Sequence, residues 1–165
     1  MTSTGNRLSL PDRNNLKAPF AALHHVALIT NDMEETVRFY RDVLGSEIAM
    51  AHRQGDNNVR HYFITVAPNT VFAFFEYPDA ERPEYLPETQ WKTQRHLDHV
   101  DFYVESLEDL RALEQRLTDN GVEVRSAMGG RSMFFTDPNN IVLQVTVGPE
   151  DKEPWPIHDD PEPAY

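Results

Sequence analysis

The same pattern of strand and helix signals occurs twice along the chain, and this internal repeat constrains the fold more than any other feature of the sequence. Each copy opens with an alternating, β-rich segment, at residues 23–30 in the first copy and 96–104 in the second. A helical pattern follows each opening strand, and three short strand candidates follow each helix. The sequence therefore predicts an α+β fold built from two tandem βαβββ modules.

Both predicted helices have recognisable start and stop signals. Asn31 or Asp32 caps the first helix, and Gly45 ends it. Ser106 caps the second helix, and Gly121 ends it. Apolar residues at helical spacing give each helix one core-facing side: Met33, Val37, Tyr40 and Leu44 in the first copy, and Leu107, Leu110, Leu113 and Leu117 in the second.

The remaining strands are expected at short β-rich segments that follow each helix. They lie near 47–53, 59–66 and 70–77 in the first copy, and near 122–126, 132–136 and 141–147 in the second. Residues 137–140, with the sequence DPNN, predict a tight turn because asparagine tolerates left-handed backbone geometry.

The repeat also divides the chain into a folded body and two flanking segments. We expect the domain at 20–148, with module one at 22–77, a linker at 78–95 and module two at 96–147. Residues 1–19 are polar and predict a flexible arm. Residues 149–165 hold five of the twelve prolines and six acids against one lysine, which predicts a solvated acidic tail. Trp155 and Ile157 offer the alternative that this tail is pinned to the body or to a partner subunit.

Composition and charge exclude several classes of partner. The formal net charge of −12 repels phosphate backbones, so we expect no nucleic-acid binding. No apolar run approaches the roughly 20 residues of a membrane span, and the N-terminal residues contain no apolar signal segment. The absence of cysteine excludes thiolate ligands and fits a cytoplasmic protein. Two shallow open sheets leave strand edges that need covering, so we expect a homodimer.

Strand alternation places one histidine of each copy at an equivalent position. Val26 and Leu28 must face the first helix, so His25 points to the other face of its strand. By the same alternation, His99 lies on the face opposite the second helix, together with Asp101 and Tyr103. If the modules pair about a pseudo-twofold axis, both imidazoles enter one cavity and approach within roughly 3 to 4 Å, as two ligands of one metal do.

Four segments together resemble the vicinal oxygen chelate superfamily, which includes glyoxalase I, methylmalonyl-CoA epimerase, fosfomycin resistance proteins and extradiol dioxygenases. They are HHVALITNDMEETVRFYRDVLG at 24–45, FAFFEYPD at 72–79, HLDHVDFYVESLEDL at 96–110 and RSMFFTDPNNIVLQV at 131–145. With the spacing between them they cover nearly the whole folded body. The resemblance implies a cup-shaped mixed sheet with helices outside, and metal ligands from the first and last strands of each module.

The resemblance maps the metal positions onto His25, Ala73, His99 and Gln144. Ala73 cannot bind a metal, which resembles the dioxygenase branch with three protein ligands. Gln144 stands where the family usually has glutamate, so the ligand set of His25, His99 and Gln144 adds no negative charge. Asp101 offers a compensating carboxylate, as a ligand, as the holder of a metal-bound water or as a general base.

Three further residues complete the list of candidates. Glu76 is a weaker candidate ligand, because its parity places it on the helix side of its strand. His61 is a candidate cavity acid or base, and Tyr103 a candidate donor to a substrate oxygen. For each, packing or a contact at the cavity rim is the alternative.

The resemblance implies a metal-dependent enzyme acting on a small oxygenated molecule that chelates the metal. The three-position site favours Fe(II) and dioxygenase chemistry of the extradiol kind, with Mn, Ni or Zn as alternative metals. A lyase or isomerase of the glyoxalase or epimerase type is the second hypothesis. The third, which Ala73 and Gln144 favour, is a metal-free binding protein similar to the bleomycin-resistance branch.

Overall fold

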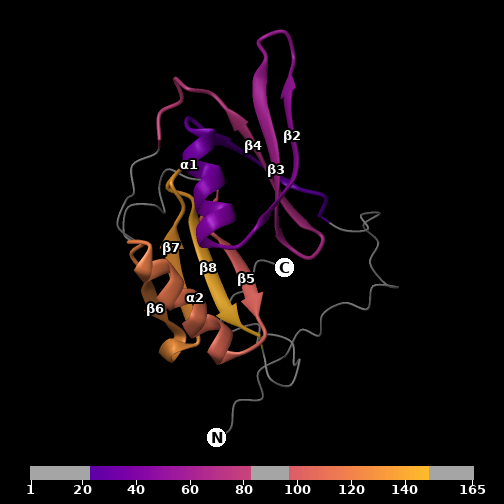
Figure 1. Ribbon diagram of the computed structural model, residues 1–165. Helices are drawn as coiled ribbons and strands as arrows, with labels where there is room; N and C mark the ends of the chain where they lie inside the picture. The colour runs from indigo at the N-terminus through magenta and orange to yellow at the C-terminus, as the bar shows by residue number, and fades with distance from the viewer. Residues whose placement is uncertain (1–22, 83–96, 149–165) are drawn as a thin grey trace, which may run out of the picture. The chain divides into compact units, whose positions relative to one another are not determined.

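The computed structural model describes residues 23–82 and 97–148, which contain two four-stranded mixed sheets (Figure 1). The predicted arm, the predicted acidic tail and most of the predicted linker lie outside the described residues. The first sheet and its helix comprise β1 (Val26–Thr30), α1 (Met33–Val37), the π-helix η2 (Arg38–Val43), β2 (Glu47–Gln54), β3 (Val59–Ala67) and β4 (Thr70–Glu76). The second comprises β5 (Val100–Val104), α2 (Leu107–Asp119), β6 (Arg125–Ala127), the 3-10 turn η4 (Met128–Gly130), β7 (Ser132–Thr136) and β8 (Val142–Val147).

The two sheets have the same topology. Their strand orders are β1-β4-β3-β2 and β5-β8-β7-β6. In each sheet the first and last strands of the module are parallel neighbours, and the other pairs are antiparallel. The predicted repeat of two βαβββ modules is therefore confirmed. The opening strands β1 and β5 each lie at an edge of their sheet, which leaves one side of their backbone without a partner in that sheet.

The first helix differs from the prediction in its second half. Asp32 caps α1 by accepting a hydrogen bond from the backbone N–H of Glu35 at 2.9 Å. From Arg38 the chain widens into a π-helix, in which Leu44 N–H donates to the Phe39 carbonyl at 3.0 Å. Phe39 and Tyr40 are adjacent in sequence and both buried, and the wider turn coincides with this pair. Gly45 ends the segment as expected, with φ at +80°.

The second helix matches its prediction closely. Ser106 caps α2 by accepting from the backbone N–H of Asp109 at 3.1 Å. Leu110 and Leu117 are buried, and Gly121 follows the helix with φ at +76°.

The helix-bearing faces of the two sheets share one hydrophobic core. Tyr40 packs on Phe74 of its own module, with ring centres 5.3 Å apart. Across the modules, the ring of Phe72 lies 5.8 Å from that of Phe102. Phe135 of module two also belongs to this buried cluster. The opposite faces of both sheets therefore point away from the core.

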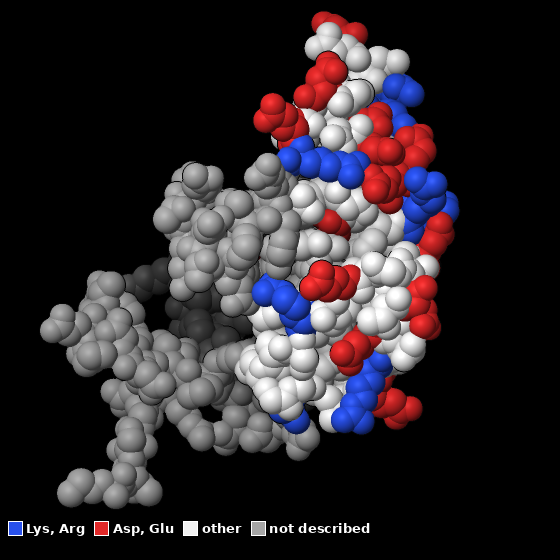
Figure 2. Space-filling view, turned by 90° about the vertical axis from the view of Figure 1, so that its left-hand side faces the viewer, with Lys and Arg blue, Asp and Glu red and all other residues white. Residues whose placement is uncertain are grey.

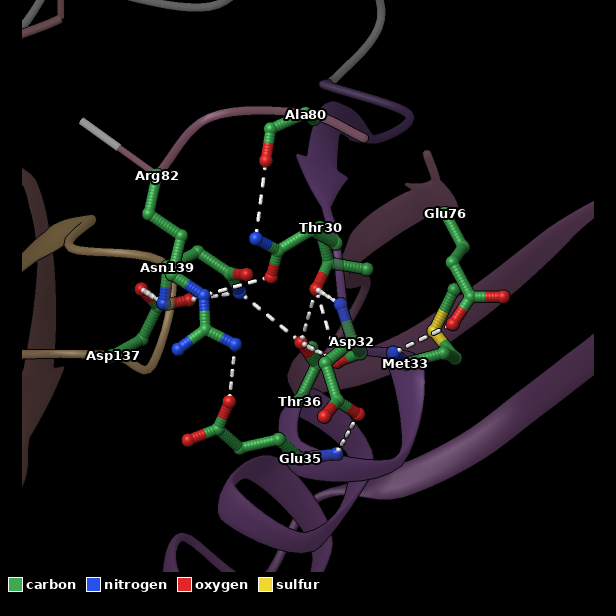
Figure 3. A network of polar contacts seen from close by, with 11 residues as sticks. Thr30, Asp32, Met33, Glu35, Thr36, Glu76, Ala80, Arg82, Asp137 and Asn139 are labelled. Atoms are coloured by element: carbon green, nitrogen blue, oxygen red, sulfur yellow. Dashed lines mark hydrogen bonds and ion pairs between the residues drawn. The ribbon is translucent and has the colours of Figure 1, made fainter. Parts of the chain in front are cut away.

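Polar contacts tie the modules together beside this core (Figure 3). Thr36 of module one accepts a hydrogen bond from Asn139 Nδ2 at 3.1 Å. The Tyr40 hydroxyl donates to the Asp137 carboxylate at 3.1 Å. Burial raises the pKa of Asp137 above its ordinary value, against the opposing effect of its hydrogen bonds. The predicted turn at 137–140 thus also anchors the first helix.

The described surface is mixed in charge. On the face drawn in Figure 2, basic and acidic side chains lie interspersed rather than in separate fields. Within the described residues, every helix is too short or too polar to cross a bilayer.

Candidate metal and substrate site

The candidate site residues of the opening strands lie on the outward faces of the sheets. In β1, Ala27 and Ile29 are exposed, whereas Val26 and Leu28 pack against the core. In β5, Asp101 and Tyr103 are exposed, whereas the alternate residues Val100, Phe102 and Val104 pack inward. The predicted alternation of both strands is confirmed. Ile29 is 56% exposed and Tyr103 is 59% exposed, so these faces carry uncovered apolar and aromatic surface.

The expectation that His25 and His99 meet in one cavity of a single chain is wrong. His25 contacts the ring of Phe63 in its own module at 5.7 Å, and His99 contacts the ring of Phe134 in its own module at 5.4 Å. Because the helix-bearing faces pack on each other, the faces that carry the two histidines point apart. Among the described residues of one chain, no three His, Asp or Glu side chains cluster as metal ligands do.

Each of the two histidines is nevertheless held in the same way by the residue that precedes it. His25 Nδ1 lies 2.7 Å from His24 Nδ1, and His99 Nδ1 is hydrogen-bonded to the Asp98 carboxylate. In both rings Nδ1 is engaged and Nε2 has no partner among the described residues. A partner on the far ring nitrogen is the usual support of a metal-binding histidine. His24 and Asp98 were not predicted as site residues, although they occupy equivalent positions in the repeat.

Gln144 and Asp101 are opposite each other in register and belong to one hydrogen-bond network. The Thr146 hydroxyl lies 3.0 Å and 2.9 Å from the two carboxylate oxygens of Asp101, to which it donates. Gln144 Nε2 donates to Ser132 Oγ at 2.8 Å and to Thr146 Oγ1 at 3.1 Å. Because Asp101 accepts, Thr146 must donate to it and accept from Gln144. Both N–H bonds of Gln144 are thereby used, and its Oε1 remains as the available oxygen.

Asp101 also lies close enough to His99 for an electrostatic interaction between the two side chains. Partial burial raises the pKa of Asp101 above its ordinary value, whereas the Thr146 hydrogen bond and His99 act in the opposite direction. Tyr103 is next along the same face, opposite Thr146. The structure therefore brings His99, Asp101 and Gln144 together in module two, with Tyr103 at the margin.

Glu76 has a structural task away from this face. Its Oε1 accepts a hydrogen bond from the backbone N–H of Met33 at 2.9 Å, at the start of α1 (Figure 3). The same oxygen lies 3.4 Å from Arg60 Nη1. A carboxylate at a helix N-terminus is favourable there. We therefore leave Glu76 out of the candidate site.

His61 lies on the outward face of module one and is only 6% exposed. Its Nδ1 lies 2.9 Å from Gln54 Oε1, and its ring stacks on Phe75 with centres 3.6 Å apart. Burial lowers the pKa of His61, and nearby His52 and His25 lower it further. His52 lies opposite His61 on the neighbouring strand and was not predicted as a site residue. Only the strand register identifies it, and the sequence alone does not give that register.

The fold and these outward polar faces define a protein of the paired βαβββ class. A family model described as the Glyoxalase/Bleomycin resistance protein/Dioxygenase superfamily matches residues 22–145. The match covers most of the chain, so the protein belongs to this superfamily, the vicinal oxygen chelate proteins.

Relatives support the same assignment. The chain is 26% identical over 129 residues to the uncharacterized protein YwkD of Bacillus subtilis (strain 168), covering 75% of this chain and 94% of that protein. It is similar to a glyoxylase/bleomycin resistance protein/dioxygenase domain from Frankia sp. EAN1pec, with a TM-score of 0.63, 24% identity and 79% and 94% of the two chains covered. It is also similar to the fosfomycin resistance protein FosX from Listeria monocytogenes, complexed with Mn(II) and 1S,2S-dihydroxypropylphosphonic acid, with a TM-score of 0.62, 20% identity and 81% and 97% covered. At this identity the structural likenesses show the fold and leave the reaction open.

Proposed function

We propose that the protein is a metal-dependent enzyme acting on a small oxygenated substrate, and that its metal site is completed between two subunits. The observation that carries this proposal is the outward placement of His25 and His99, each with Nδ1 held by its neighbour and Nε2 open. Within one chain the two imidazoles lie on faces that point apart. In a dimer, His99 of a second copy can approach His25 of the first, and His25 of the second can approach His99 of the first.

The surface around the two histidines supports a homodimer. β1 and β5 are edge strands, and the residues on or beside their outward faces include large apolar side chains that are exposed. These are Leu23 at 64%, Ile29 at 56%, Leu97 at 46% and Tyr103 at 59% exposure. In a twofold dimer, β1 of one subunit lies against β5 of the other, so that both edges and both apolar patches are covered.

The donor set fits a divalent metal of intermediate softness, which accepts both nitrogen and oxygen ligands. His25 of one subunit contributes an imidazole nitrogen, and His99 and Gln144 of the other contribute a nitrogen and an amide oxygen. Asp101 adds the negative charge that Gln144 lacks. When bound, the metal holds and polarises the oxygen atoms of the substrate. Two histidines and an oxygen donor suit Fe(II), and Mn(II), which accompanies the Listeria FosX protein, is the first alternative.

The protein residues around these donors serve binding and proton transfer. Asp101 is placed to take a proton from a substrate hydroxyl or carbon, because its raised pKa brings it closer to neutral pH. Tyr103 is placed to donate a hydrogen bond to a substrate oxygen. Within this class we favour an oxygenase acting on a vicinal diol or enediol, and a lyase or isomerase on the same substrate type is the second possibility.

A metal-free binding protein is the competing function, and the neutral Gln144 and the Ala73 position favour it. Metal analysis of the purified full-length protein after incubation with Fe(II) or Mn(II) discriminates the two. One bound metal per chain supports the enzyme. Absence of binding at excess metal supports the binding protein. Oxygen uptake with catechol-type substrates then separates an oxygenase from a lyase.

The composite nature of the site is tested by mixing two variants, His25→Ala and His99→Ala. Each homodimer alone lacks one imidazole in both composite sites and should lose the Fe(II) or Mn(II) bound there. After subunit exchange, a mixed dimer has one intact site, so random pairing restores on the order of one quarter of wild-type occupancy. A site within one chain predicts no restoration. Co-purification of untagged with tagged wild-type subunits under the same conditions is the control for exchange.

A further inference from the structure

A second histidine pair lies on the outward face of module one. His52 on β2 and His61 on β3 are direct partners in the antiparallel register. β2 and β3 form a long hairpin (Figure 1), and β2 is the edge strand opposite β1. The ring of Phe63 contacts both His61, with centres 4.4 Å apart, and His25, with centres 5.7 Å apart. The pair is therefore a neighbour of the site proposed above, made of different side chains.

Both imidazoles present a nitrogen that is buried and has no partner among the described residues. These atoms are His52 Nδ1 and His61 Nε2. Gln54 Oε1 is an acceptor, so it fixes the proton of His61 on Nδ1 and leaves a lone pair on Nε2. Buried polar atoms are normally paired, so two unpaired imidazole nitrogens on neighbouring rings point to a missing ligand.

The spacing of the rings matches two ligands of one metal ion. A metal–nitrogen bond of about 2.0 to 2.1 Å places the ion roughly 3.2 Å from each ring centre. For angles between octahedral and tetrahedral values, the ring centres are then about 4.5 to 5.2 Å apart. The observed separation is 4.9 Å, with the ring planes at 62°.

The aromatic surroundings hold the two rings in this arrangement. His61 stacks on Phe75, and His52 lies parallel to Phe63 at an interplanar angle of 19°. Because the rings are already fixed, little side-chain freedom is lost when an ion binds.

We propose that His52 and His61 form a second metal site, which takes a divalent cation with a preference for imidazole nitrogen, such as Zn(II), Ni(II) or Cu(II). Water completes the coordination, since no third His, Asp or Glu of the described residues joins the pair. The ion clamps the edge strand β2 to β3 and so stiffens one wall of the outward face. This site is independent of the composite site and of the reaction carried out there.

The test is a titration of the full-length protein with ZnCl2. Calorimetry measures the zinc affinity, and metal analysis measures the bound zinc per chain. The parent variant is His99→Ala, which removes the composite site and leaves module one unchanged. It should retain one zinc per chain. Adding His52→Ala should weaken this zinc at least about tenfold, the lower range for loss of a group that supports a metal. Met50→Ala, on the same strand and face, is the matched control and should retain the zinc.

A second measurement does not depend on any variant of the pair. In the imidazole 1H–15N spectrum of the His99→Ala protein, one nitrogen of His52 and one of His61 should shift from the unprotonated to the metal-bound position on addition of zinc. Unshifted nitrogens, or equal zinc affinity with and without His52→Ala, would overturn the second site. Neither result touches the composite site, whose own test is the mixing of His25→Ala and His99→Ala.

Discussion

Replacement of Asp101 by asparagine tests whether this carboxylate supplies the charge that the Gln144 position lacks. Asp101 and His99 are two residues apart on one strand face, about 6.6 Å along the strand. If this spacing is taken as the separation of the carboxylate from a metal on His99, a single negative charge and a divalent cation attract by about 1.3 kcal/mol at the dielectric of water and about 2.5 kcal/mol at half that value. Asp101 is exposed, so this range is appropriate. We expect Asp101→Asn to weaken metal binding about 10- to 70-fold.

The assay is a competition titration of Fe(II) or Mn(II) against a chelator, with enzymatic rate as a second readout. Glu123→Gln removes the same charge from an exposed position in module two and should leave both values unchanged. Raised salt should also weaken wild type more than Asp101→Asn, because only wild type retains the screened attraction. Full metal affinity in Asp101→Asn would show that the carboxylate does not compensate for Gln144.

Substitutions at three further positions have defined outcomes. Gln144→Glu should bind metal at least as tightly as wild type in the same titration, but should lower the melting temperature of the metal-free protein, because a second carboxylate would then face Asp101 directly. Asp137→Ala should lower the free energy of unfolding in urea by about 3 to 5 kcal/mol, because it leaves the Tyr40 hydroxyl and buried backbone N–H groups unpaired. The pKa of Asp137 is raised, so its contribution to stability is largest below the ordinary value of about 3.9 and falls as the pH rises toward the folded-state value; Asp137→Asn should remove that slope. Gly45→Ala should cost about 1 to 2 kcal/mol in the same urea experiment, because φ there is positive.

The sequence was sufficient for the elements and faces of the fold, because these depend on local periodicity and on the repeat. Val26 and Leu28 face the core as alternation requires. The sequence did not predict which faces of the two modules pack together. The observed packing depends on contacts such as Tyr40 with Asp137, which join residues far apart in the chain. This is why His25 was expected beside His99 within one chain.

The site residues that the sequence missed are those defined by side-chain direction or by strand register. Asp98 is a neighbour of His99 in sequence, and its function becomes visible only with the side-chain direction. His61 was a candidate, but His52, nine positions before it, was not, because only the β2–β3 pairing makes the two histidines partners. Thr146 links Asp101 to Gln144 through a hydroxyl that no charge or metal-ligand pattern marks.

A metal site shared between subunits makes metal binding and dimer formation mutually dependent. If the metal binds only to the dimer, it must tighten the dimer by the same factor by which dimerisation tightens the metal, because coupling free energies are reciprocal. At a free metal concentration about 100 times its dissociation constant, each occupied site stabilises the dimer by about 2.7 kcal/mol. Sedimentation of the full-length protein across a dilution series should therefore show stronger association with Mn(II) than with a chelator, and His99→Ala should show no difference. If the association constant of wild type is the same with Mn(II) and with the chelator, the metal is not held between subunits, and the shared site of His25 and His99 is wrong.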